Sequence, residues 1–256
     1  MVSFFGRSIL HIGNFIAQYH FYLVTFVLSS FLARFVGVEN VGYIFIVSSF
    51  IVALVLYAAP PLFRSFGTRN AISVLAIAII ACLLGLSILT DTTAIIVVVT
   101  LYSALAYALF IGIDLLIEAS IVRESVTGTT RSTYLAMTNT AVLVASLSLA
   151  FIVIGDAYYR AFVFSALALV PFIILSLWFF PRISFPSRDG QSRTVTEQLA
   201  QNPSLKKIAG AHLLMQVFFS WMSIYMPILL FSFEGFGWDE IGIILGVAMI
   251  PYIILE

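Results

Sequence analysis

The stretch Gly37-Val38-Glu39-Asn40-Val41-Gly42 returns, 200 residues later, as Gly237-Trp238-Asp239-Glu240-Ile241-Gly242. Both copies place two polar residues between apolar ones and begin and end with glycine. Each copy forms a short turn between two long apolar segments. A membrane protein built from two equivalent halves shows this kind of repeat, and transporters are commonly built in that way.

The amino-acid composition indicates a chain whose solvent is lipid. Hydrophobic residues make up 62% of the sequence and charged residues 9%, and the mean hydropathy is +1.11. Soluble domains hold about 45–50% apolar and about 25% charged residues. The balance of 12 basic and 12 acidic residues argues against a nucleic-acid partner, which needs a basic surface. The single cysteine, Cys82, gives no support for disulfides or a cysteine zinc cluster.

Apolar stretches long enough to cross a bilayer follow one another along the chain. A spanning helix needs about 20 mostly apolar residues, and its backbone must satisfy its own hydrogen bonds in lipid. We therefore predict an all-α polytopic membrane protein, in which Pro60 and Pro61 end the second span. Seven complete spans and one partial span are expected at 13–34, 41–60, 70–90, 94–118, 131–155, 160–180, 208–231 and 240–256.

A charged segment divides these spans into two groups. We predict a six-helix transmembrane bundle over 1–180, a linker over 181–207 and the start of a second bundle over 208–256. In the repeat, Glu256 corresponds to Leu56, so the chain is expected to stop within its eighth helix. A closed path across the membrane would then need the missing C-terminal helices or a partner chain.

The distribution of basic residues predicts the orientation, because lysine and arginine are enriched in cytoplasmic loops. With the N-terminus inside, ten basic residues fall in cytoplasmic segments and only Arg34 and Arg160 in outer ones. We expect a multi-pass protein of a plasma or inner membrane, with the N-terminus and the 181–207 linker in the cytoplasm.

Polar residues are unevenly distributed among the spans. The third and sixth spans carry few and are expected at the periphery, whereas the first carries a stripe at helical spacing. Polar groups at membrane depth usually face the bundle interior or a wet cavity. The alternative is that they join helices through hydrogen bonds of about 0.6–2 kcal/mol each. The candidates for a substrate path are Asn14, Gln18, Tyr22, Thr25, Tyr107, Asn139, His212, Gln216 and Ser220.

Two carboxylates share one face of the fourth span near its predicted cytoplasmic end. Asp114 and Glu118 are four residues apart, a spacing at which like charges repel unless a positive group is near. We predict an ion-pair cluster that links them to the turn between the second and third spans and acts as a cytoplasmic gate. The alternative is two carboxylates solvated by lipid headgroups. The gate candidates are Arg64, Gly67, Arg69, Asp114, Glu118 and Arg123.

An enzymatic interpretation has little support in the sequence. A pair of carboxylates with this spacing could hold Mg²⁺ for a lipid-phosphate transferase, but no second acidic cluster accompanies it. No P-loop, dinucleotide fingerprint or metalloprotease helix is present. We therefore expect no enzyme activity, no metal and no cofactor.

The layout resembles the major facilitator superfamily, of which this chain would be the first two-thirds. That family's signature between helices 2 and 3 is Gly-x-x-x-Asp-Arg-x-Gly-Arg-Arg/Lys, and the corresponding stretch here is Pro60-Pro61-Leu62-Phe63-Arg64-Ser65-Phe66-Gly67-Thr68-Arg69. Gly67 and Arg69 fit the late positions. Arg64 stands where the aspartate belongs and Ser65 replaces the arginine, so the family's usual charge-relay gate does not carry over unchanged.

The resemblance implies a secondary active transporter that moves a small solute, of unknown identity, across the lipid bilayer by alternating access. Unlike many proton-coupled members of the family, the chain has no carboxylate near the middle of a span. The alternative from another class is a non-transporting membrane scaffold or a transporter relic, which the degenerate signature would suit. A lipid flippase of another helical family is a third interpretation, which the repeat and the linker disfavour.

Overall fold

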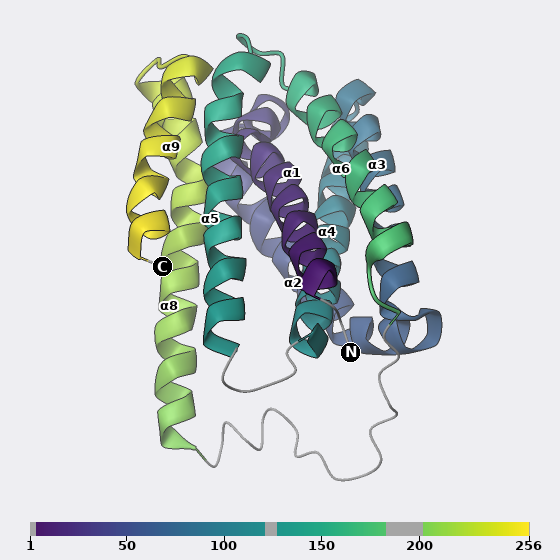
Figure 1. Cartoon of the computed structure of the whole chain (residues 1–256). Coiled ribbons are helices and arrows are strands. Elements are labelled where there is room, and N and C mark those ends of the chain that lie inside the picture. Colours follow the sequence, from purple (N-terminus) through teal and green to yellow (C-terminus); the bar gives the residue numbers. More distant parts are fainter. Residues whose placement is uncertain (1–3, 121–126, 183–201, 256) are drawn as a thin grey trace.

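The computed structural model describes residues 4–120, 127–182 and 202–255, and its regular secondary structure in these ranges is helical throughout (Figure 1). Seven of the described helices are long and apolar enough to cross a membrane, which confirms the predicted all-α, multi-pass class. The elements are α1 (Phe4–Val36), α2 (Val38–Phe66), α3 (Thr68–Ile88), α4 (Thr92–Ser120), α5 (Thr127–Ile152), α6 (Tyr159–Phe179), α8 (Pro203–Ile228), the π-helical η2 (Leu229–Phe233) and α9 (Trp238–Leu255).

The prediction that Pro60 and Pro61 end the second span was wrong, because α2 continues through both to Phe66. A proline inside a helix removes one backbone hydrogen bond, and its ring crowds the carbonyl of the residue four positions earlier. Transmembrane helices tolerate it where other groups satisfy the freed carbonyl. The carbonyls that lose their donors belong to Leu56 and Tyr57, and neither residue is buried.

The start of α8 also differs from the prediction, which placed the second bundle from residue 208. α8 begins at Pro203, because the Asn202 side chain accepts hydrogen bonds from the backbone N–H groups of Ser204 and Leu205, at 3.1 and 3.2 Å. Proline suits the first helical position, where no N–H is needed. Most of the predicted linker, 183–201, lies outside the described residues.

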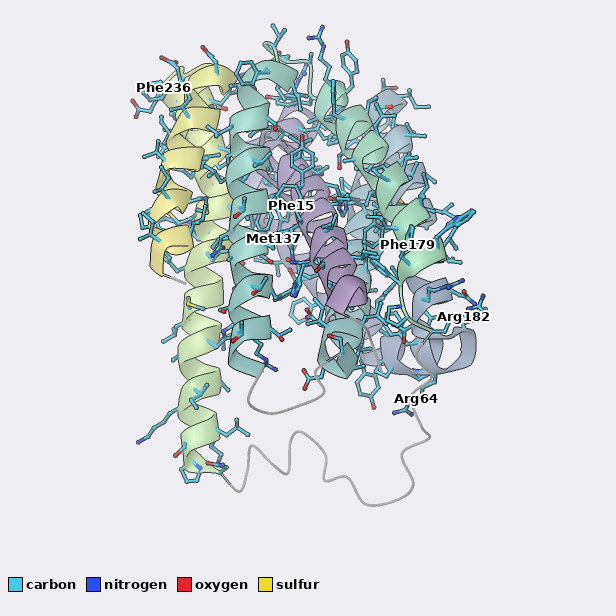
Figure 2. All side chains as sticks on the ribbon, in the orientation of Figure 1. Phe15, Arg64, Met137, Phe179, Arg182 and Phe236 are labelled. Atoms are coloured by element: carbon cyan, nitrogen blue, oxygen red, sulfur yellow. The ribbon has the colours of Figure 1, made fainter. Side chains whose placement is uncertain are left out.

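The helices run between two ends of the bundle, which Figure 2 identifies by labelled residues. Arg64 and Arg182 lie at one end and Phe236 at the other; these are called the Arg64 end and the Phe236 end. α1 lies in the middle, in contact with α2, α4, α5, α6 and α8. α3 and α6 pack on each other at the side away from α8 and α9 (Figure 1), α3 also packs on α4, and α6 also packs on α1.

The glycine that ends each copy of the repeat lies where the two parts of the chain, α1–α6 and α8–α9, approach each other closely. A Cβ atom on Gly42 of α2 would collide with the Tyr225 hydroxyl of α8. A Cβ atom on Gly242 of α9 would lie 2.6 Å from the Ser146 carbonyl oxygen of α5. Each glycine therefore admits an atom of the other part of the chain where a larger residue could not.

α9 is held on α5 through two glycines one turn apart. Besides Gly242, Gly246 leaves room for Leu147 of α5, whose side chain would lie 2.9 Å from an added Cβ atom. Small residues at this four-residue spacing let the backbones of membrane helices approach closely. The α5–α9 contact is the most extensive between any two helices of the described chain.

We expect Gly242→Ala to lower the midpoint temperature of unfolding in detergent, since overpacking costs about 1–3 kcal/mol. Gly210→Ala in α8 is the matched control: a Cβ atom there meets nothing within 4 Å, and alanine favours a helix over glycine. Differential scanning fluorimetry of the two variants checks this. Equal midpoints for both would contradict a tight α5–α9 contact.

Candidate functional site

A chain of polar side chains, buried on α1 and half-buried on α5, joins the two helices inside the bundle. Asn14 is fully buried, and its Nδ2 donates to Thr138 Oγ1 at 3.0 Å and to the Tyr134 carbonyl oxygen at 3.4 Å. One turn along α1, Gln18 Nε2 donates to Asn14 Oδ1 at 3.4 Å. Figure 2 labels the chain neighbours Phe15 and Met137, which lie between the two ends of the bundle.

The chain of hydrogen bonds continues to α4 through Tyr134. The Tyr134 hydroxyl donates to Asp114 Oδ1 at 2.6 Å, and the Gln18 side chain also lies within hydrogen-bonding reach of it. Beyond it, Arg131 Nη2 pairs with Glu118 Oε2 at 3.3 Å. We call these side chains of α1, α4 and α5 the polar cluster: Asn14, Gln18, Asp114, Glu118, Arg131, Tyr134 and Thr138.

A cavity opens beside the charged part of the polar cluster. Its volume is about 270 Å³, close to the lower limit of about 300 Å³ for common ligand pockets. α8 does not close off this part of the chain, because its described side chains are all exposed from Asn202 to Trp221. The cavity is lined by Asp114, Ile117, Glu118, Arg131, Tyr134 and Leu135.

An aromatic group formed by α1, α4 and α8 includes two of the predicted path residues. Phe21 makes edge-to-face contacts with Tyr22, Tyr107 and Phe110, at ring-centroid distances of 5.4, 5.5 and 5.0 Å. Tyr22 also meets Phe219 of α8 at 6.3 Å. Tyr22 therefore lies on the side of the bundle that α8 faces, and Tyr107 joins the group through Phe21.

The other predicted path residues lie on α1, α5 and α8. Thr25 Oγ1 donates to a backbone carbonyl of its own helix at 2.8 Å, which satisfies the hydroxyl locally. Asn139, which follows Thr138 in the sequence, is half-buried. His212 and Ser220 are exposed on α8. The side chain of Gln216 lies outside the described part of the chain.

The expected link between the carboxylates and the α2–α3 turn is replaced by a link to α5. Within the described residues, Glu118 pairs with Arg131, and neither Arg64 nor Arg69 forms an ion pair with Asp114 or Glu118. Arg64 is exposed, and the Nε of Arg69 is buried without a hydrogen-bond partner in the same ranges.

The geometry of α4 explains this difference. A Cβ atom on Gly112 would lie 2.7 Å from Ile72 and 3.0 Å from Phe63, so this position of α4 faces α2 and α3. Asp114 follows two residues later, about 200° around the helix. It therefore points to the opposite side, where α5 lies, and Glu118 shares its face.

The remaining gate candidates fall in connecting segments. Gly67 is the single residue between α2 and α3, and its φ of 74° is a left-handed conformation that glycine adopts without strain. Arg123 lies outside the described residues. Gly67 has no side chain with which to contact the polar cluster.

A second contact between the two parts of the chain lies near the Phe236 end and is aromatic. Tyr158, from the segment before α6, contacts Trp238 and Phe231 at ring-centroid distances of 5.7 and 6.3 Å. Trp238 stacks on Phe231 at 5.3 Å, and Tyr158 also meets Phe31 of α1 at 6.1 Å. Tyr158 and Trp238 are each only 2% exposed, so this aromatic contact seals the packing of α9 and η2 against the first six helices.

An arginine from the end of α1 reinforces the aromatic contact. The Arg34 guanidinium lies 5.6 Å above the Tyr158 ring, a cation–π distance. It also pairs with the Asp156 carboxylate at 3.7 Å and donates to its carbonyl oxygen at 3.1 Å. Burial, with a smaller effect from the Asp156 charge, raises the pKa of Tyr158 to about 12, so the phenol stays neutral at physiological pH.

Three members of the polar cluster, Arg131, Tyr134 and Thr138, were not predicted as site residues. The sequence holds a signal for all three, because they follow one another at three and four residues and thus share a helix face. A tyrosine and an arginine near a helix end are common enough that only the contacts with α1 and α4 distinguish them.

We expect Asn14→Ala and Thr138→Val to be non-additive, because each removes the same interhelical hydrogen bond. A double-mutant cycle on the free energy of unfolding should give a coupling of about 0.6–2 kcal/mol. Thr25→Val serves as the control partner for Asn14→Ala, since its hydroxyl bonds within its own helix. Additive effects in the Asn14/Thr138 pair would rule out the bond as a stabilising contact.

We expect the indole of Trp238 to be shielded from acrylamide by the aromatic contact. In a Trp178→Phe, Trp221→Phe background, Trp238 is the one remaining tryptophan, and Tyr158→Ala should increase its fluorescence quenching. Tyr159→Ala is the matched control, because the neighbouring Tyr159 is 51% exposed. The same quenching in both variants would contradict the packing of Tyr158 on Trp238.

The comparisons with known proteins add no family assignment to this geometry. No protein-family model matches this chain, and no curated protein matches its sequence.

Proposed function

We propose that this chain belongs to a secondary active transporter of the major facilitator type, which moves a small solute across the membrane by alternating access. The observation that carries the proposal is the polar cluster, which leads from Asn14 and Gln18 inside the bundle to the cavity beside Asp114. Polar and charged groups inside membrane proteins are costly and usually mark a substrate or ion path.

The unequal contacts at the two ends of the bundle also support the proposal. Near the Phe236 end, aromatic side chains join α9 and η2 to the first six helices. Toward the Arg64 end, the first half of α8 is exposed. A transporter that is open to one side combines a sealed end and an open end in this way, with its binding site reached from the open end.

The second candidate function is that of a non-transporting membrane scaffold. It is favoured by the α2–α3 turn, where Arg64 and Arg69 make no ion pair with the carboxylates of α4 within the described residues. A scaffold has no need of a water-accessible path, and this difference separates the two functions experimentally.

We expect water to reach Gln18 through the polar cluster. In a Cys82→Ala background, Gln18→Cys should react with a membrane-impermeant methanethiosulfonate reagent applied to vesicles from one side. Val74→Cys, on the exposed apolar face of α3, is the control and should stay unreactive in lipid. Protection of both cysteines from both sides would reject the transport path and favour the scaffold.

A further inference from the structure

The charged residues that line the cavity in the described part of the chain do not balance. Its lining residues include two carboxylates and one guanidinium. Arg131 forms its ion pair with Glu118, at 3.3 Å, whereas Asp114 accepts a hydrogen bond from the neutral Tyr134 hydroxyl at 2.6 Å. With both carboxylates ionised, the described lining residues carry an excess of one negative charge. Among the described residues Asp114 forms no ion pair within 4 Å, and the Arg131 charge that acts on it is already paired with Glu118.

Aromatic rings continue from Asp114 along the same face of α4. Phe110 and Tyr107 precede Asp114 by four and seven residues, a spacing that places all three on one side of the helix. Phe21 of α1 contacts both rings, at 5.0 and 5.5 Å. Tyr107 is 44% exposed, so part of its ring is free to meet another group.

This combination selects among the ligand classes that the cavity could take. The excess negative charge of the cavity would repel an anion, which excludes this class of ligand. A bare divalent metal ion requires several carboxylate or imidazole ligands together, and the described residues contain no group of three such side chains. A carboxylate followed by aromatic faces is the arrangement that recognises organic ammonium groups, through charge and through cation–π attraction.

We infer that the cavity beside Asp114 binds a monovalent organic cation with an apolar body. The charged group pairs with the Asp114 carboxylate, and the apolar body extends toward Tyr107 and Phe110. This inference rests on the proposed function, because it names the substrate class of the same path. Glu118 and Arg131 neutralise each other at the mouth of the cavity, so Asp114 supplies the selectivity for positive charge.

The test is equilibrium binding of radiolabelled tetraethylammonium to the full chain in lipid nanodiscs, measured by scintillation proximity. We expect saturable binding that Asp114→Asn weakens by about tenfold or more, as loss of the charge partner of a bound ion requires. Asp91→Asn is the matched control at the other end of α4. It makes the same change of charge, and asparagine keeps the cap that Asp91 provides to the Ala94 N–H.

A second pair of variants tests the aromatic faces without altering Asp114. Tyr107→Leu should weaken tetraethylammonium binding by about two- to fivefold, whereas Tyr107→Phe should retain it. Equal binding by the wild type, Asp114→Asn and Tyr107→Leu, or no saturable binding by the wild type, would overturn the inference.

The binding experiment and the labelling of Gln18→Cys test different claims, so either claim can be rejected without the other. Labelled Gln18→Cys without saturable tetraethylammonium binding overturns the cation class and leaves the transport path standing. Saturable binding that depends on Asp114, with Gln18→Cys protected from both sides, supports the cation site and rejects transport.

Discussion

The packing of α9 on α5 at Gly242 is the contact on which the position of the second part of the chain depends. The first half of α8 is exposed, whereas α9 makes the most extensive helix–helix contact in the described chain. Lipid provides little hydrophobic drive for helices to associate, so close backbone approach over small residues has to supply the attraction. The missing side chain of Gly242 is therefore what lets α9 and η2 dock, and the aromatic contact around Tyr158 follows from that docking.

Polar residues within membrane spans can join helices or can line a path for a ligand, and the polar cluster has members in both positions. Asn14 and Thr138 join α1 to α5 by a part-buried hydrogen bond, which is the stabilising role that such residues commonly have. Asp114 and Tyr134 border a cavity, where a polar group is available to a ligand. Within one network, Asn14 and Thr138 therefore hold the helices together, and Asp114 and Tyr134 are available to a ligand.

The ion pair between Glu118 and Arg131 is suited to form and break. Its side chains are 70% and 65% exposed, and exposed ion pairs contribute only about 0–1 kcal/mol. In the proposed transporter, a movement of α5 relative to α4 would therefore cost little at this point. The gate expected at the α2–α3 turn would have coupled different helices, whereas in this conformation Gly112 faces Ile72 and Phe63 and Asp114 accepts a hydrogen bond from Tyr134 of α5.

The sequence alone determined the helical class, most span positions and the polar stripe of α1, because lipid leaves the backbone few alternatives to the helix and hydropathy records which segments cross it. The 200-residue repeat marked Gly42 and Gly242, but only the tertiary structure assigned their partners, Tyr225 and Ser146. The tertiary structure likewise decided that Asp114 points toward Tyr134 rather than toward Arg64. It depends on the rotation of α4 about its axis, which packing against α2 and α3 sets and which no local pattern around Asp114 encodes.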